Sequence, residues 1–188
     1  MQVFFLAKII SITCMIGCTG NHKKKEIYEY YSAQDYYTTK KYDVHVHIDT
    51  YDPYFINQCA KENFYLLSLN VNVGDLPPIE EQQKFSVYQL NHYPGQIAYA
   101  TTFKVDGWNS EEWTKKTISY LDESFHKGAI GVKVWKNIGM ELKDNKGNFV
   151  MVDNPRFDPV FDFIEKNNKT LIGHIGEPRN CWLPIEKM

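Results

Sequence analysis

The chain has 188 residues, of which 43% are hydrophobic and 15% aromatic, and its formal net charge at pH 7 is −2. This composition is typical of a globular protein, and the length is sufficient for one core of domain size. Proteins that bind nucleic acid usually carry a basic surplus, which is missing here, so we expect no nucleic-acid partner.

Residues 1–18 read MQVFFLAKIISITCMIGC and contain an apolar stretch with the length of a secretory signal, too short for a confident membrane span. The stretch ends in Met15-Ile16-Gly17-Cys18, which resembles the lipobox of bacterial lipoproteins. The resemblance implies a lipoprotein signal peptide over residues 1–18 and acylation of Cys18. The protein would then be exported and anchored to a bacterial membrane, facing the periplasm or the cell surface. An uncleaved anchor or a buried first helix is the alternative.

Residues 19–40 are polar and rich in tyrosine, and they show no clear periodicity. We expect a tether, or an extended arm whose tyrosines pack on the domain. The folded domain is expected over residues 41–188.

From residue 41 onward, short apolar runs alternate with segments of helical periodicity. Such runs are typical of strands that are buried on both faces of a parallel sheet. Ser110 is a good N-cap for one of the helices, and Gly128 follows its end. The predicted strands are Tyr42–Ile48, Phe64–Val71, Gln96–Phe103, Ala129–Trp135 and Thr170–His174, and the predicted helices are Pro53–Asn63, Pro78–Tyr93, Ser110–Lys127 and Phe157–Asn168.

This alternation at roughly 30-residue spacing predicts an α/β fold with parallel strands and right-handed crossovers. An open doubly wound sheet and a (β/α)8 TIM barrel both satisfy it. No glycine-rich phosphate loop follows the first strand, which weakens the nucleotide-binding version of the open sheet. The connection 136–155 is long and carries a hairpin signal at Asn145–Asn148; long loops of this kind are usually functional.

Two histidines stand one residue apart at the end of the first predicted strand. Residues i and i+2 of a strand share a face, so His45 and His47 are expected on one face together with Asp43, and Val44 and Val46 on the other. Two imidazoles at this spacing can hold one divalent ion. The alternative is a pair of core histidines that are satisfied by hydrogen bonds.

His174, at the end of the fifth predicted strand, supplies a third imidazole at an equivalent level. Three such ligands with one open position are typical of catalytic metal sites. Lys133, in the fourth predicted strand, is expected to point inward with Trp135, because Val132 suits the helix-covered face. Its amine would pair with a carboxylate, bind an anionic substrate, or carry a carbamate that bridges two metals.

HVH in the first strand, GAIGVKVWKNIGM around the fourth and LIGHIGEP around the fifth resemble the amidohydrolase superfamily, in particular its amidohydrolase-related ("amidohydrolase 2") branch. The resemblance runs from Tyr42 to the end of the chain. It implies a metal-dependent TIM barrel that acts on a small molecule, with a divalent metal, expected to be zinc, held by His45, His47 and His174. Lys133 is the weaker match to a further metal ligand of the family.

A family barrel has eight strands, whereas about five are predicted here, so we expect a partial barrel of the first five βα units, truncated at its C-terminal side. The resemblance implies hydrolysis of an amide, lactone or ester. Decarboxylation or hydration within the same branch, or a non-catalytic surface-tethered binding protein, are the alternatives. Glu177 and Asp49 are candidate catalytic carboxylates, Trp135 a candidate aromatic wall, and Arg179 a candidate partner for a substrate carboxylate.

Overall fold

The computed structural model describes residues 30–174 and 183–187. The chain divides into two units, Met1–Tyr31 and Ser32–Met188, and every helix and strand below belongs to the second. In chain order its elements are α1 (Ala33–Thr38), β1 (Lys41–Val46), α2 (Tyr54–Lys61), β2 (Phe64–Leu69), α3 (Ile79–His92), β3 (Ile97–Thr101), α4 (Glu111–His126), β4 (Gly131–Val134), α5 (Asn137–Met140), η1 (Pro155–Phe157), α6 (Asp158–Lys166), β5 (Thr170–Gly173) and η3 (Ile185–Lys187).

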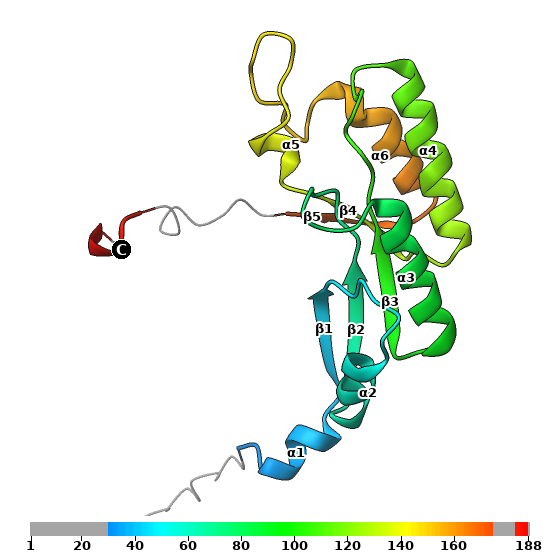
Figure 1. The fold of residues 1–188 in the computed structure, drawn as a ribbon, viewed down its shortest axis with the longest axis vertical. Coiled ribbons are helices and arrows are strands. Elements are labelled where there is room, and N and C mark those ends of the chain that lie inside the picture. Colours follow the sequence, from blue (N-terminus) through cyan, green and yellow to red (C-terminus); the bar gives the residue numbers. More distant parts are fainter. Residues whose placement is uncertain (1–29, 175–182, 188) are drawn as a thin grey trace, which may run out of the picture. The chain divides into compact units, whose positions relative to one another are not determined.

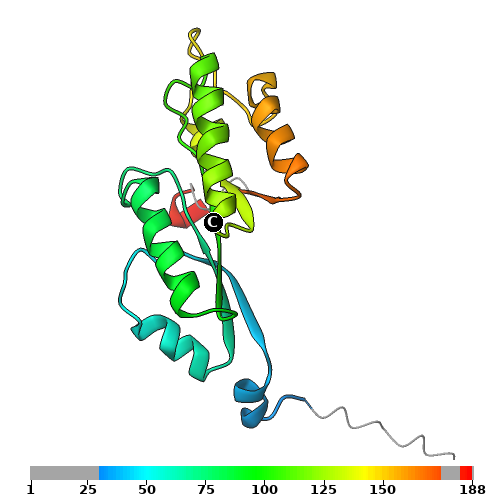
Figure 2. The same cartoon turned by 90° about the vertical axis from the view of Figure 1, so that its right-hand side faces the viewer.

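The five strands form one parallel sheet in the order β1-β2-β3-β4-β5, curled into a half-barrel (Figures 1 and 2). The predicted α/β fold with parallel strands is therefore confirmed, and the half-barrel is compatible with part of a TIM-like barrel. Because neighbouring strands are parallel, all five carboxyl ends lie at the same edge of the sheet. Candidate residues that follow different strands are thereby brought to one side of the fold.

The convex face of the sheet packs against the helices. In one cluster, Val132 and Val134 of β4 meet Leu121 of α4 and Val160 of α6. A second cluster joins Leu66 of β2 and Ile97 of β3 to Ile56 of α2, and all of these side chains are buried. Full burial of each such side chain contributes roughly 1.5–3 kcal/mol, so these two clusters account for much of the driving force for folding.

Helix α3 buries several polar side chains. The Gln82 side chain forms two hydrogen bonds of 2.9 Å with the backbone of Val71. Its Oε1 accepts from the Val71 amide, and its Nε2 donates to the Val71 carbonyl. Ser86 Oγ donates to Asn70 Oδ1 at 2.9 Å, and Gln83 Nε2 donates to Ser124 Oγ at 2.6 Å. Buried polar groups need such partners, so this helix is seated on the sheet by hydrogen bonds.

Three local predictions can be compared directly with the structure. Ser110 caps α4, its side chain accepting from the Trp113 amide, as expected. The hairpin in the long loop after β4 is present as an antiparallel bridge between Lys143 and Phe149. A short helix, α1, lies inside the segment expected as a tether. It is stabilised by a capping box in which the Ser32 and Asp35 side chains each accept from the other's backbone amide.

Candidate metal centre

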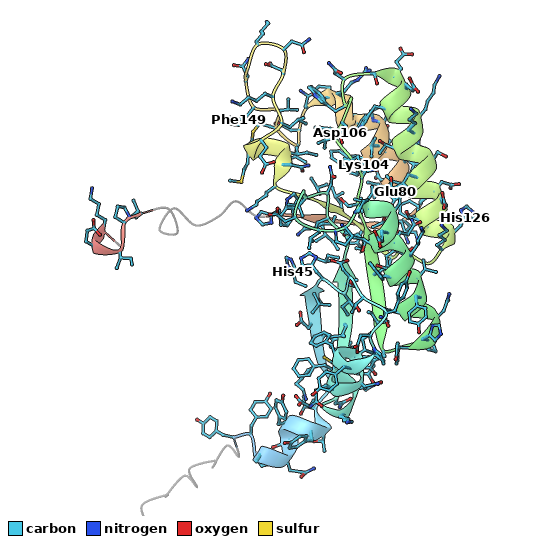
Figure 3. All side chains as sticks on the ribbon, in the orientation of Figure 1. His45, Glu80, Lys104, Asp106, His126 and Phe149 are labelled. Carbon is cyan, nitrogen blue, oxygen red and sulfur yellow. The ribbon has the colours of Figure 1, made fainter. Side chains whose placement is uncertain are left out.

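Four of the predicted residues lie on the concave side of the sheet, in or directly after the strands β1, β4 and β5. His45 lies in β1 (Figure 3), His47 directly follows it, Lys133 is in β4 and His174 follows β5. Burial lowers the pKa of His45, and the positive charges of Lys133, His47 and His174 lower it further. A charge acts this way only at short range, so these four side chains share one electrostatic environment.

A β-bulge in β1 places the two histidines on this side. Asp43 is opposite Leu66 of β2 and Val46 is opposite Ser68, so three steps along β1 match two along β2. Val46 then packs in the convex-face cluster with Leu66. Asp43 also faces the helix side, because its partner Leu66 packs there.

The expectation that Asp43 shares a face with the histidines is therefore wrong, as is the one that Val44 faces the helices. Val44 lines a concave cavity of ≈ 330 Å³ together with Tyr42 and Tyr65. The physical reason is the extra residue of the bulge, which reverses the alternation of faces between Asp43 and Val46.

The ring of His47 is held by a hydrogen bond of the kind that supports metal-binding histidines. Its Nδ1 lies 2.7 Å from the carbonyl oxygen of Leu69, and a carbonyl can only accept, so Nδ1 carries the proton. Nε2 of the neutral ring then has a free lone pair. Donation from the second ring nitrogen to a carbonyl is the usual support of a metal-bound histidine.

The spacing of His45 and His47 also suits one ion. Their ring centroids are 5.3 Å apart, with the rings edge to face. Two imidazoles bound to one tetrahedral zinc have centroids about 5 Å apart, since each coordinating nitrogen lies about 2.1 Å from the metal. The spacing of the two rings is therefore compatible with a single divalent ion.

His174 does not complete this pair in the structure. Its amide donates to the Val134 carbonyl at 3.1 Å, which extends the β4–β5 pairing by one residue. Its ring rests edge to face on Trp135, with centroids 4.9 Å apart. Among residues 30–174 and 183–187, no three His, Cys, Asp or Glu side chains are close enough to hold a metal ion as they stand. The structure thus brings the imidazoles of His45 and His47 together, whereas that of His174 lies against Trp135 after β5.

Lys133 is only 2% exposed, and burial lowers the pKa of its amine. As predicted, it faces away from the helices that Val132 and Val134 contact. Trp135 is half-buried, and the amine of Lys136 lies 5.6 Å from the centre of its ring. Asp49 is half-buried after β1; burial raises the pKa of its carboxyl, and the nearby His47 charge opposes that rise.

Glu177, Arg179 and Cys18 lie outside the described residues. His92 and His126, which do not stand at strand ends, are exposed on α3 and α4; Figure 3 labels His126 on the outer side of α4.

Two supporting groups were missed by the sequence reasoning. Ser68 Oγ accepts from the Ile48 amide at 3.1 Å, and Thr102 Oγ1 donates to the carbonyl of Lys133 at 2.8 Å. Both side chains are buried at the sheet. Ser68 interrupts the apolar run FYLLSL two residues before another polar residue, Asn70, and this alternation near a strand end was the available signal.

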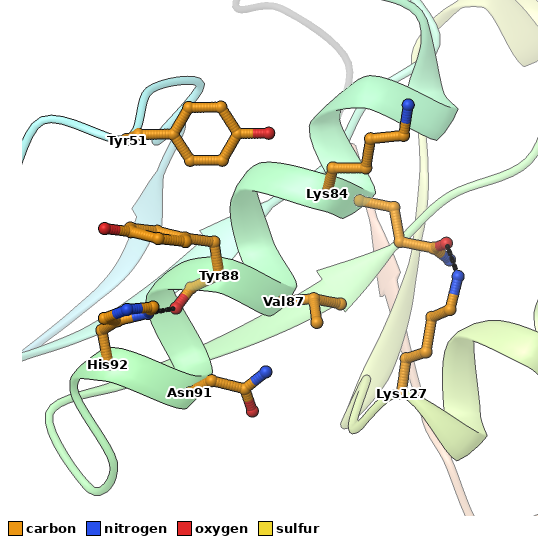
Figure 4. A pocket seen from close by; sticks show the side chains of 8 residues that line it. Tyr51, Lys84, Val87, Tyr88, Asn91, His92 and Lys127 are labelled. Carbon is orange, nitrogen blue, oxygen red and sulfur yellow. Dashed lines mark hydrogen bonds between the residues drawn. The ribbon is translucent and has the colours of Figure 1, made fainter.

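A second pocket, of ≈ 340 Å³, lies on the outer surface of α3 between Tyr51 and Lys127 (Figure 4). His92 stacks on Tyr88 there, with ring centroids 3.9 Å apart. None of the predicted metal or catalytic residues lines it, so it is separate from the candidate centre.

Comparisons with family models, curated proteins and solved structures found no match to this chain. No helix in the described ranges is long and apolar enough to cross a membrane.

Proposed function

We propose that this chain belongs to a metal-dependent hydrolase of the amidohydrolase type, which cleaves an amide, lactone or ester bond in a small molecule. The observation that carries the proposal is the paired imidazoles of His45 and His47, with Nε2 of His47 left free by the bond from Nδ1 to Leu69. The placement of both rings beside Lys133 and His174, at the carboxyl ends of parallel strands, supports it.

Each residue has a defined part in this proposal. His45 and His47 would hold the divalent ion, for which zinc is the expected metal, and His174 is the proposed third ligand. Such an ion, when bound, supplies a Lewis acid that polarises a carbonyl and acidifies water. The amine of Lys133 binds an anionic part of the substrate. Alternatively, Lys133 carries a carbamate and serves as a further metal ligand. Trp135 forms one wall.

Asp49 is the proposed proton acceptor within the described residues, because it stands two residues after His47 and its carboxyl is partly shielded from water. Glu177 and Arg179 are assigned from the sequence alone, as an assisting carboxylate and a partner for a substrate carboxylate. The half-barrel of five strands is compatible with part of a TIM-like barrel, and the proposal assigns the site to a barrel of this kind.

Anchorage at a bacterial membrane through a lipid on Cys18 belongs to the same proposal. We expect the protein to partition into detergent when it is expressed in bacteria, and the Cys18→Ala variant to remain in the aqueous phase. An unmodified Cys18 in the mass spectrum of the mature protein would contradict the anchor without affecting the metal centre.

Metal analysis tests the hydrolase proposal most directly. The full chain is titrated with Zn²⁺ beside a His45→Ala/His47→Ala double variant. A His92→Ala/His126→Ala variant is the matched control, because it removes two exposed histidines outside the centre. We expect tight zinc binding by the wild type and the control and its loss in the first variant. Equal zinc binding by all three proteins would refute the ligand assignment.

A further inference from the structure

The side on which His45 lies depends on the bulge alone. Asp43 is paired with Leu66, and a regular ladder would next pair His45 with Ser68. Leu66 packs against α2, and Tyr99, the residue opposite Ser68 in β3, donates to the Ser124 carbonyl in α4. A regular β1 would therefore aim His45 into the helix layer, away from Lys133 and His174.

A bulge releases backbone amides from the ladder, and each released amide near the core needs a new acceptor. Two side chains supply these acceptors here. Oδ1 of Asp43 accepts from the His45 amide at 3.0 Å, and Oγ of Ser68 accepts from the Ile48 amide at 3.1 Å. The two bonds lie on either side of the histidine pair, one at the start of the bulge and one just after His47.

Ser68 is well suited to this task because it is 1% exposed and belongs to the neighbouring strand. Water cannot readily replace its hydroxyl, so its loss would leave the Ile48 amide without a partner. The next residue along β2 is Leu69, whose carbonyl accepts from Nδ1 of His47. Movement of the Ile48 amide away from β2 would therefore also break the bond that sets the protonation form of His47.

We infer that Asp43 and Ser68 are positioning residues, which hold the β1 bulge in place and thereby aim both imidazoles at the concave side. Their role in metal binding rests on the proposed function, whereas their role in orienting the rings does not. Neither side chain would touch the substrate.

The test uses two readouts on the full chain: the ¹⁵N shifts of the histidine rings, which report which ring nitrogen carries the proton, and Zn²⁺ affinity measured by competition. Ser68→Ala is compared with Ser86→Ala, which removes an equally buried serine hydroxyl that bonds to Asn70. Asp43→Ala is compared with Asp43→Asn, which keeps an acceptor oxygen at the same place.

We expect Ser68→Ala and Asp43→Ala to replace the single His47 form by a mixture and to weaken zinc binding about 10- to 100-fold. Ser86→Ala and Asp43→Asn should keep the wild-type ring shifts. An unchanged His47 form in both alanine variants would overturn the inference, and the Asp43 pair decides the matter if Ser68→Ala fails to fold. If the wild type binds no zinc but the two alanine variants still change the ring shifts, the positioning role is supported and only the metal centre is refuted.

Discussion

Gly131 lies at a close contact between β4, which carries Lys133, and β5, which His174 follows. It lies in β4 opposite Thr170 of β5, and a Cβ at this position would be 2.7 Å from the Thr170 carbonyl oxygen. An ordinary carbon–oxygen contact is about 3.4 Å, so Gly131→Ala must push the strands apart by about 0.7 Å. The obstructing atom belongs to the backbone and cannot rotate away. We expect this variant to be destabilised by about 1–3 kcal/mol.

Gly173 provides the matched control, because it lies in β5 and a Cβ there would meet nothing within 4 Å. Gly173→Ala should leave the free energy of unfolding unchanged or raise it by up to about 1 kcal/mol, since alanine restricts the unfolded chain. Urea unfolding followed by circular dichroism measures both changes. With a slope of about 2 kcal/mol per molar urea, the midpoint of Gly131→Ala should fall by about 0.5–1.5 M.

Hydrogen exchange gives an independent readout of the same strand separation. The His174 amide donates to the Val134 carbonyl at 3.1 Å, so it should lose protection in Gly131→Ala and keep it in Gly173→Ala. Equal urea midpoints for the two variants, together with unchanged protection at His174, would refute the steric argument.

Three further predictions concern stability. Lys133→Met should raise the free energy of unfolding by roughly 1–3 kcal/mol, because it removes a buried cation. The same variant should abolish any hydrolysis. Lower stability of the variant in urea would contradict the argument. Phe157→Ala should lower the free energy of unfolding by about 3–5 kcal/mol, since this fully buried ring packs against Trp108 and Trp113. The control Phe149→Ala, at a ring that is 53% exposed, should change the free energy of unfolding by less than about 0.5 kcal/mol. Similar urea midpoints for the two variants would show that burial is not the cause. Burial raises the pKa of Tyr120 from 10.0 to about 12, so the folded state holds the hydroxyl proton more tightly than the unfolded state. The contribution of this group to stability is complete below pH 10 and is lost as the pH rises toward 12. Tyr120→Phe should therefore reduce the fall in melting temperature at alkaline pH.

The sequence predicted the elements well because their signals are local. Every predicted strand overlaps an observed one, although β1 begins one residue before the predicted start at Tyr42, and Val132 and Val134 pack against helices as their alternation with Lys133 indicated. Helix α1 was missed because its six residues are too few for a periodic pattern, although Ser32 and Asp35 form a recognisable capping box.

The geometry of the centre could be predicted only in part, because it depends on contacts between strands. The spacing of His45 and His47 indicated a shared face, but the face itself is set by how β1 pairs with β2. Nothing in residues 41–50 by themselves reveals that Asp43 lies across the sheet from the imidazoles. The position of His174 depends in the same way on the path of β5.

The polar underside of α3 affects how this helix tolerates change. Apolar packing is non-directional, so a helix with an apolar buried face can shift or rotate slightly and still pack against its neighbours. The hydrogen bonds of amide side chains such as Gln82 and Gln83 form in only one position of the helix. A shift of one residue would leave several of these buried amides without a hydrogen-bond partner. Conservative-looking swaps there, such as Gln82→Glu, should therefore be tolerated far less well than swaps among the aliphatic residues beneath α4.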